Sequence, residues 1–229
     1  INNFFFSSPE SISWLLNIRS KQINFTPVVL SFLLLNMNEK SLFFGKQNLS
    51  LKKHLGNKFN IFKIEDLKEV LINFSITNKE VYLDPKKTPF YIEDFFKTIG
   101  VKVKYIEDPC THLKLIKNPV EIRGSRNSHI KDGISICKFL FWLDKKLKQN
   151  KKISELSTSE KLFEFRKGNK LFAGLSFETI SGFGSNSSII HYRVSKSSNK
   201  IFKKNNLYLF DSGAQYLDGT TDVTRTLII

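Results

Sequence analysis

The first half of the chain alternates between short apolar runs and longer segments in which apolar residues recur every three or four positions. Residues 28–35 are almost continuously apolar, which predicts a strand buried on both faces of a sheet. Residues 65–74 and 88–99 have the spacing of amphipathic helices. This alternation predicts an α/β arrangement, a mixed sheet with helices packed on it. The other elements predicted here are a helix over 11–16 capped by Ser8, and strands over 41–44, 61–64, 81–83 and 101–106.

The second half opens with the longest helical pattern of the chain, over residues 120–147. Its apolar residues form one stripe, the spacing of a helix that packs one face against its neighbours. A second helix over 159–167, capped by Ser157 or Ser159, and an antiparallel sheet complete an α+β arrangement. The stripe consists of Ile130, Ile134, Cys137 and Phe141, and the strands are predicted over 179–183, 189–193, 207–211 and 220–228.

Residues 110–118 have neither pattern and predict a linker. We therefore expect a first domain over 1–112, a linker over 113–119 and a second domain over 120–229. No internal repeat is visible. The chain starts without Met and stops inside an apolar run, so we expect it to be an internal piece of a longer protein.

Lysine dominates the charge of the chain. The 229 residues contain 36 Lys and Arg against 21 Asp and Glu, a net charge of +15. Because the cations occur singly or in pairs along the whole chain, we expect a solvated lysine-rich surface and no nucleic-acid partner. The 41% hydrophobic and 25% charged residues exclude a disordered chain.

The two cysteines, Cys110 and Cys137, are too few for a disulfide framework or a four-thiolate zinc site. They favour a reducing compartment, and we expect a cytoplasmic protein. The most apolar stretch, 23–38, is interrupted by Asn24 and Pro27 and is shorter than the roughly 20 residues of a membrane span. We therefore expect no membrane partner.

Two aspartates border apolar runs near the end of the chain: Asp211 ends one run and Asp222 begins another. Aspartate is unfavourable inside strands, and a carboxylate facing a core must be paired, protonated or bound to metal. Both could instead be turn residues, as Asp218 is. If a two-residue turn is centred on Asp218–Gly219, Asp222 lies opposite Gln215, roughly 13 Å from Asp211, too far for a shared ion.

A turn centred between Leu217 and Asp218 gives a different register. Asp211 then pairs with Thr224, and the two aspartates lie diagonally on one face, about 7–8 Å apart before side-chain reach is counted. Carboxylates so placed could flank two divalent cations about 3.5–4 Å apart. Spacing leaves both registers open.

The motif around these aspartates is Asp211-Ser-Gly-Ala-Gln-Tyr followed by Asp-Gly-Thr-Thr-Asp222-Val-Thr-Arg-Thr. Together with 8–19 and 118–124, it resembles aminopeptidase P, the cytosolic type of Xaa-Pro aminopeptidase with the pita-bread metallopeptidase fold. The resemblance covers essentially the whole chain. It implies a non-catalytic, creatinase N-terminal-like domain followed by the first half of a pita-bread catalytic domain.

The resemblance implies roles for three residues. Asp211 matches a ligand of one metal ion, and Asp222 matches a ligand that bridges two ions. His191 matches a histidine that binds substrate and stabilises the tetrahedral intermediate. The implied cofactors are two divalent ions, Mn²⁺ first with Zn²⁺ or Co²⁺ as alternatives, and the implied partners are Xaa-Pro peptides and a second copy in a homodimer. Because the family's remaining ligands, one His and two Glu, lie downstream of the matched residues, we expect this chain alone to be inactive.

One loop departs from the family pattern Gly-x-Gly-Pro-Asn-Gly-Ala. Its residues Ser185, Ser187 and Ser188 replace a Pro, a Gly and an Ala, which changes loop stiffness and permitted backbone angles. We expect this change to affect substrate affinity more than metal binding. A prolidase-like or creatinase-like hydrolase is an alternative, as is a non-catalytic pita-bread binding module, although such modules typically lose the metal aspartates.

Overall fold

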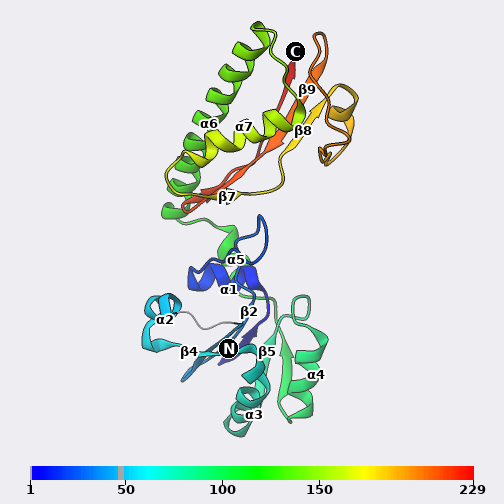
Figure 1. The fold of residues 1–229 in the computed structure, drawn as a ribbon. Coiled ribbons are helices and arrows are strands. Elements are labelled where there is room, and N and C mark those ends of the chain that lie inside the picture. The colour runs from blue at the N-terminus through cyan, green and yellow to red at the C-terminus, as the bar shows by residue number, and fades with distance from the viewer. Residues whose placement is uncertain (1, 46–48) are drawn as a thin grey trace. The chain divides into compact units, whose positions relative to one another are not determined.

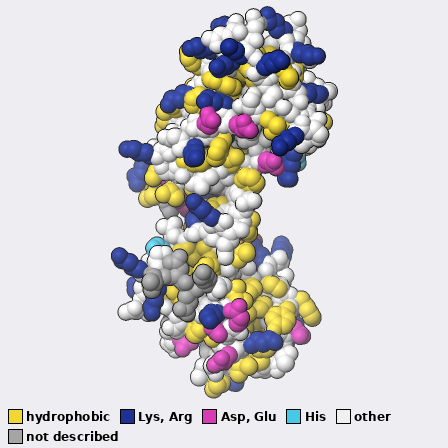
Figure 2. Space-filling view, viewed as in Figure 1, with side chains coloured by type: hydrophobic (Ala, Val, Ile, Leu, Met, Phe, Trp, Pro, Cys, Tyr) yellow, Lys and Arg dark blue, Asp and Glu magenta, His cyan; other side chains and the backbone are white. Residues whose placement is uncertain are grey.

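The chain folds as two compact units, Ile1–Ile116 and Lys117–Ile229, in a computed structural model that describes residues 2–45 and 49–229 (Figure 1). The division falls within the segment 113–119 that the sequence predicts as a linker. No helix in the described part of the chain is long and apolar enough to cross a membrane. Lys and Arg side chains are spread over the visible face of both units (Figure 2).

The first unit is built on a mixed sheet of six strands in the order β4-β3-β2-β1-β5-β6, which confirms the α/β prediction. The central strand β1 pairs antiparallel with β2 and parallel with β5. The sequence pattern predicts no strand at β1, because a run of three phenylalanines shows no alternation. The strands are β1 (Asn3–Phe6), β2 (Ser31–Asn36), β3 (Lys40–Phe44), β4 (Asn60–Phe62), β5 (Glu80–Leu83) and β6 (Lys102–Tyr105).

Helices cover both faces of this sheet, so β1 is buried on each side. Phe5 packs in one core with residues of α3 and α4, whereas Phe4 and Phe6 pack in a second core with α1, because successive strand residues point to opposite faces. The helices are α1 (Pro9–Leu16), α2 (Leu49–Leu55), α3 (Leu67–Thr77), α4 (Phe90–Thr98) and α5 (Cys110–Leu115), with short 3-10 turns η1 (Gly56–Lys58) and η2 (Ile64–Asp66).

Three details of this unit differ from the predictions. Strand β2 begins at Ser31 rather than at residue 28, because the amide of Val29 bonds to the side chain of Ser13 instead of to a neighbouring strand. Helix α2 is not predicted by any apolar spacing. The predicted linker at 110–118 contains α5, which is anchored by Cys110, only 2% exposed and packed in the core with α1.

The second unit packs two helices on antiparallel strands, which confirms the α+β prediction (Figure 1). Phe139 and Leu143 of the long helix and Phe210 of the sheet lie in its core. The strands form two three-stranded sheets, ordered β11-β10-β7 and β12-β9-β8. The elements are α6 (Pro119–Lys148), α7 (Glu155–Lys167), β7 (Phe172–Leu175), β8 (Ile180–Phe183), η3 (Gly184–Ser188), β9 (Leu207–Ser212), β10 (Ala214–Tyr216), β11 (Gly219–Thr220) and β12 (Val223–Ile228).

The apolar stripe predicted on α6 is exposed, so the prediction that it packs against the fold is wrong. Ile130 is 63% exposed and Phe141 71%, with Ile134 and Cys137 between them also exposed. The buried face carries small and polar residues in its first half, where it approaches a hairpin closely and holds a buried ion pair, and large apolar residues in its second half, where it meets the core. It is formed by Gly124, Ser128, Asp132, Ser135, Ile136, Phe139 and Leu143.

The predicted strand at 189–193 is also wrong, because these residues form a turn after η3. The amide of Ile189 donates to the carbonyl of Asn186, and the amide of Tyr192 donates to the carbonyl of Ile189, so this backbone closes local turns instead of pairing with a strand. Ile190 is 86% exposed despite the apolar run. Helix α7 begins at Glu155 rather than at 159, because Ser154 is the residue whose hydroxyl caps it.

Candidate metal centre

Asp211 and Asp222 lie on the two arms of one antiparallel hairpin. Asp211 of β9 pairs with Thr224 of β12, and Tyr216 pairs with Gly219 across a turn at Leu217 and Asp218. This is the register in which the two aspartates lie diagonally on one face, so the alternative centred on Asp218–Gly219 is excluded. Asp222, directly before β12, is level with Gly213 between β9 and β10.

The two carboxylates are close enough to affect each other. Burial raises the pKa of Asp222, and the neighbouring charge of Asp211 and a hydrogen bond to it raise that pKa further. Oδ1 of Asp211 is buried and has no hydrogen-bond partner among the described residues. A buried carboxylate oxygen without a donor, next to a second carboxylate, suits a hard divalent cation, which would supply the missing positive charge.

Gly213 allows the two arms to approach each other at the level of the aspartates. A Cβ atom at this position would overlap the carbonyl oxygen of Thr221 and the hydroxyl of Ser176. That hydroxyl donates to the Thr221 carbonyl at 2.9 Å, and the Thr221 hydroxyl accepts from the amide of Ala214 at 3.0 Å. The hairpin therefore stays closed where β9 passes into β10.

A buried ion pair supports the hairpin. Arg166 of α7 donates to Asp132 of α6 through two bonds of 2.7 and 2.9 Å, and both side chains are fully buried. Nη2 of Arg166 also reaches the carbonyl of Ser212, next to Asp211, at 3.4 Å. The hydroxyl of Tyr216 donates to Asp132 at 3.0 Å; burial first, and this carboxylate second, raise the pKa of Tyr216.

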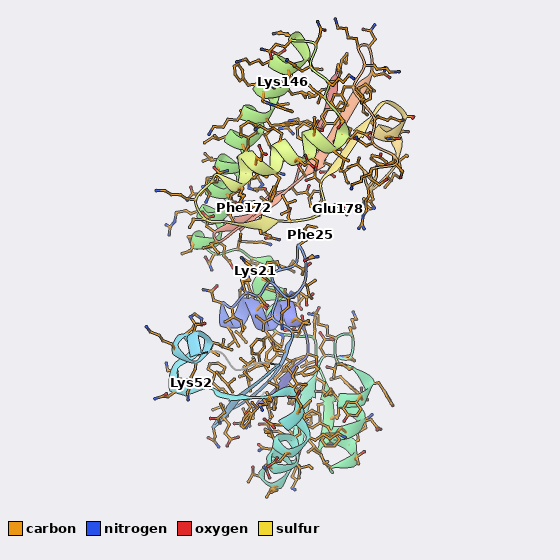
Figure 3. The ribbon with its side chains drawn as sticks, viewed as in Figure 1. Lys21, Phe25, Lys52, Lys146, Phe172 and Glu178 are labelled. Atoms are coloured by element: carbon orange, nitrogen blue, oxygen red, sulfur yellow. The ribbon has the colours of Figure 1, made fainter. Side chains whose placement is uncertain are left out.

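The tip of the hairpin is docked on the N-terminal half of α6. Lys131 pairs with both carboxylate oxygens of Asp218 at 2.6 and 2.7 Å. Gly124 lies against the Asp218 backbone so closely that a Cβ atom there would overlap its carbonyl oxygen. Phe172 on β7, labelled in Figure 3, packs edge to face on Tyr216 with ring centroids 6.1 Å apart. The hairpin is thus held at its tip and along its length.

Sequence comparison agrees with this arrangement. Residues 1–121 match the model of the creatinase/prolidase N-terminal domain, and residues 125–229 match the model of metallopeptidase family M24. The chain joins a creatinase/prolidase N-terminal domain to metallopeptidase M24 sequence. Its first unit is therefore the creatinase/prolidase N-terminal domain, and its second unit is M24 sequence of the pita-bread fold.

Relatives of this M24 chain include the Xaa-Pro aminopeptidase ApepP of Drosophila melanogaster, 37% identical over 229 residues, and a probable Xaa-Pro aminopeptidase P of Paracoccidioides brasiliensis, 35% identical over 237 residues. The chain aligns over 96% and 98% of its own length but spans only 36% and 38% of theirs. The crystal structure of a Caenorhabditis elegans X-prolyl aminopeptidase, described as a cytosolic enzyme with a di-nuclear active site, matches with a TM-score of 0.89 at 31% identity. The match covers 99% of this chain and 38% of that one.

Within the M24 unit, the structure brings the two predicted metal aspartates together but leaves His191 apart from that pair. His191 lies in an exposed turn with φ 53°, a conformation unusual for a residue with a Cβ. Arg193, two positions later, pairs with Glu178 at 3.4 Å. In the part of the chain that the structure describes, no three His, Cys, Asp or Glu side chains converge as a complete metal site.

The sequence patterns predict no role for Asp132 or for Arg166. The two residues are 34 positions apart on different helices, and their pairing leaves no signal in hydrophobic spacing. A charged residue on the buried face of a helix could indicate such a pair. The sequence does not reveal this signal, because the buried face is known only from the structure.

Proposed function

We propose that the whole protein to which this chain belongs is an Xaa-Pro aminopeptidase, which hydrolyses the first peptide bond of peptides with proline in second position. This proposal rests on one observation: the carboxylates of Asp211 and Asp222 lie close together on a single hairpin, and one oxygen of Asp211 has no hydrogen-bond donor. Relatives named Xaa-Pro aminopeptidase and a neighbour described as di-nuclear support this proposal.

In this proposal, Asp211 and Asp222 would be ligands that hold the divalent ions. Bound ions of this kind lower the pKa of a coordinated water to near neutrality and so supply a nucleophile. Two carboxylates alone cannot fill the coordination of two ions, so further ligands, one His and two Glu, must come from outside these 229 residues. This chain by itself should therefore bind metal weakly and hydrolyse nothing.

His191 is the residue that we propose to contact the substrate. Its exposed ring can donate a hydrogen bond to the carbonyl oxygen of the scissile bond, where negative charge develops during hydrolysis. We further propose Mn²⁺ as the physiological ion, with Zn²⁺ or Co²⁺ as alternatives, a homodimer, and a cytoplasmic location. Nucleic acids and membranes are not among the partners we propose.

A substrate panel tests the activity. The whole protein, loaded with Mn²⁺, is offered Xaa-Pro-Xaa tripeptides, Xaa-Pro dipeptides and creatine, and we expect release of the first residue from tripeptides with little dipeptide hydrolysis. Preferential cleavage of dipeptides, or turnover of creatine, would replace the proposal with a prolidase-like or creatinase-like function. No hydrolysis of any of the three would favour a non-catalytic module.

The metal ligands are tested with a matched pair of variants. Asp222→Asn should abolish activity and reduce the bound Mn²⁺ per chain, because the amide removes a bridging negative charge. Asp144→Asn changes an exposed aspartate of α6 and should alter neither quantity. Full metal content in Asp222→Asn would contradict the assignment of this residue as a ligand.

A further inference from the structure

The segment from the end of β8 to residue 200, which contains His191, is attached to the second unit by one buried carboxylate. Glu155 is the first residue of α7 and is fully buried. No Lys or Arg side chain forms an ion pair with it within residues 2–45 and 49–229. Its charge is therefore balanced by hydrogen bonds, the condition under which a carboxylate is tolerated in a protein interior.

Every hydrogen bond that the side-chain carboxylate of Glu155 accepts comes from this one segment. Oε1 accepts from the amide of Phe183 at 2.7 Å and from the side chain of Asn186 at 3.0 Å. Oε2 accepts from the amide of Lys200 at 2.8 Å and from the hydroxyl of Tyr192 at 3.2 Å. These donors are spread over the whole segment: one lies at its start, one in η3, one directly after His191 and one at its end. The single side chain of Glu155 therefore bonds to the segment along its full length.

A second set of contacts closes the base of the segment. The amide nitrogen of Asn186, which has two hydrogens to share, also lies 2.7 Å from the hydroxyl of Tyr192 and 3.2 Å from the carbonyl of Ser198. The Tyr192 hydroxyl lies 2.9 Å from the hydroxyl of Ser198. Tyr192 is only 7% exposed, and burial raises its pKa, so its hydroxyl remains a donor at neutral pH.

The tip of the segment has the opposite character. Ile190 is 86% exposed, and His191 next to it is exposed with a positive φ. A turn with a buried, fully hydrogen-bonded base and an exposed tip can present a side chain in a fixed position without packing that side chain itself. Tyr192 joins base and tip, because it is covalently adjacent to His191 and bonded to Glu155.

We infer that Glu155 is a positioning residue that fixes the place of His191 through Asn186 and Tyr192. The consequence for catalysis rests on the proposed function, whereas the structural role does not. Glu155 touches no reacting atom in this account; it acts only by holding the turn that carries His191.

The structural role is tested by amide hydrogen exchange on the whole protein. In Glu155→Gln, one of the two oxygens becomes an NH₂ group that faces donors, so exchange over 184–200 should become about tenfold faster or more. Glu164→Gln, an exposed glutamate on the same helix, is the matched control and should leave exchange unchanged. Unchanged exchange over 184–200 in Glu155→Gln, or equally faster exchange over β9 and β12, would overturn the inference.

The gentler variant Tyr192→Phe removes only one hydroxyl, and it decides the question if Glu155→Gln does not fold. It should accelerate exchange over the same segment to a smaller extent. Equal protection of 184–200 in Tyr192→Phe and the parent protein would contradict the role of the Glu155–Tyr192 contact in holding this segment.

The link to His191 is tested by kinetics on an Xaa-Pro-Xaa tripeptide. Glu155→Gln should lower kcat by about tenfold to a hundredfold, because the position of His191 is no longer fixed. The bound metal per chain should stay unchanged, because Asp211 and Asp222 lie outside the segment that Glu155 holds. In a His191→Ala background the same substitution should have no further effect. Effects that multiply in the double variant would show that Glu155 does not act through His191. If the parent protein cleaves no Xaa-Pro peptide, the proposed function fails, and the exchange comparison still decides the structural role.

Discussion

The buried pair of Asp132 and Arg166 makes a quantitative prediction about stability. Asp132→Asn keeps the shape of the side chain but leaves the guanidinium of Arg166 buried without a counter-charge, since both residues are fully buried. Breaking a buried pair in this way costs about 3–5 kcal/mol. That is a large part of the roughly 5–15 kcal/mol that stabilises a typical domain.

The assay is urea unfolding followed by the fluorescence of Trp142, which packs on Phe139 in the core of the second unit. With a urea dependence of about 2 kcal/mol per molar, the unfolding midpoint of Asp132→Asn should fall by roughly 2 M. Asp144→Asn is the matched control. It breaks an exposed pair with Lys148 and should shift the free energy of unfolding by less than about 0.5 kcal/mol.

A second variant separates charge from packing. Adding Arg166→Met to Asp132→Asn removes the unpaired cation and should restore much of the lost stability, because apolar replacement of a whole buried pair is often neutral or favourable. The reasoning is refuted if Asp132→Asn costs less than about 1 kcal/mol, or if the double variant is no more stable than Asp132→Asn alone.

Two further predictions concern burial. Phe139→Ala should reduce the free energy of unfolding by about 3–5 kcal/mol, whereas Phe141→Ala on the exposed face of α6 should change it by less than about 0.5 kcal/mol; equal losses in urea unfolding would mean that the buried face is assigned wrongly. Burial raises the pKa of Cys110 to about 11, so its thiol stays protonated and enclosed at pH 8 while exposed Cys137 reacts. Mass spectrometry after brief iodoacetamide treatment should show one adduct, on Cys137, and a second adduct before unfolding would contradict this prediction.

The hairpin register could be narrowed from sequence because strand pairing has few solutions. Once the turn is centred between Leu217 and Asp218, every later pair follows, including Asp211 with Thr224. Residue spacing leaves both turn centres open. In the structure, the turn is centred between Leu217 and Asp218, and its tip contacts Gly124 and Lys131. Those contacts come from a helix distant in sequence, and no local pattern contains them.

The α6 face and the 189–193 turn show what periodicity misses. Apolar spacing correctly predicts that α6 is a helix, but Phe141 lies on the exposed side because the buried side is occupied by a close backbone approach and by Asp132. Ile190 has high strand propensity, yet the amides of its neighbours Ile189 and Tyr192 bond within local turns. Strand propensity describes the conformation that a segment favours by itself. The hydrogen-bond partners that the fold offers decide whether the segment takes that conformation.

The position of β1 in its sheet has a consequence for biosynthesis. Phe4 is among the earliest residues of the unit to be translated, yet it pairs with Leu35 of β2 and with Tyr82 of β5. Until β5 leaves the ribosome, one edge of this very apolar strand has no partner, the state in which strands associate with other chains. Nascent copies of this protein should therefore be most prone to associate with other chains in the interval between synthesis of β1 and release of β5, and should need chaperones most in that interval.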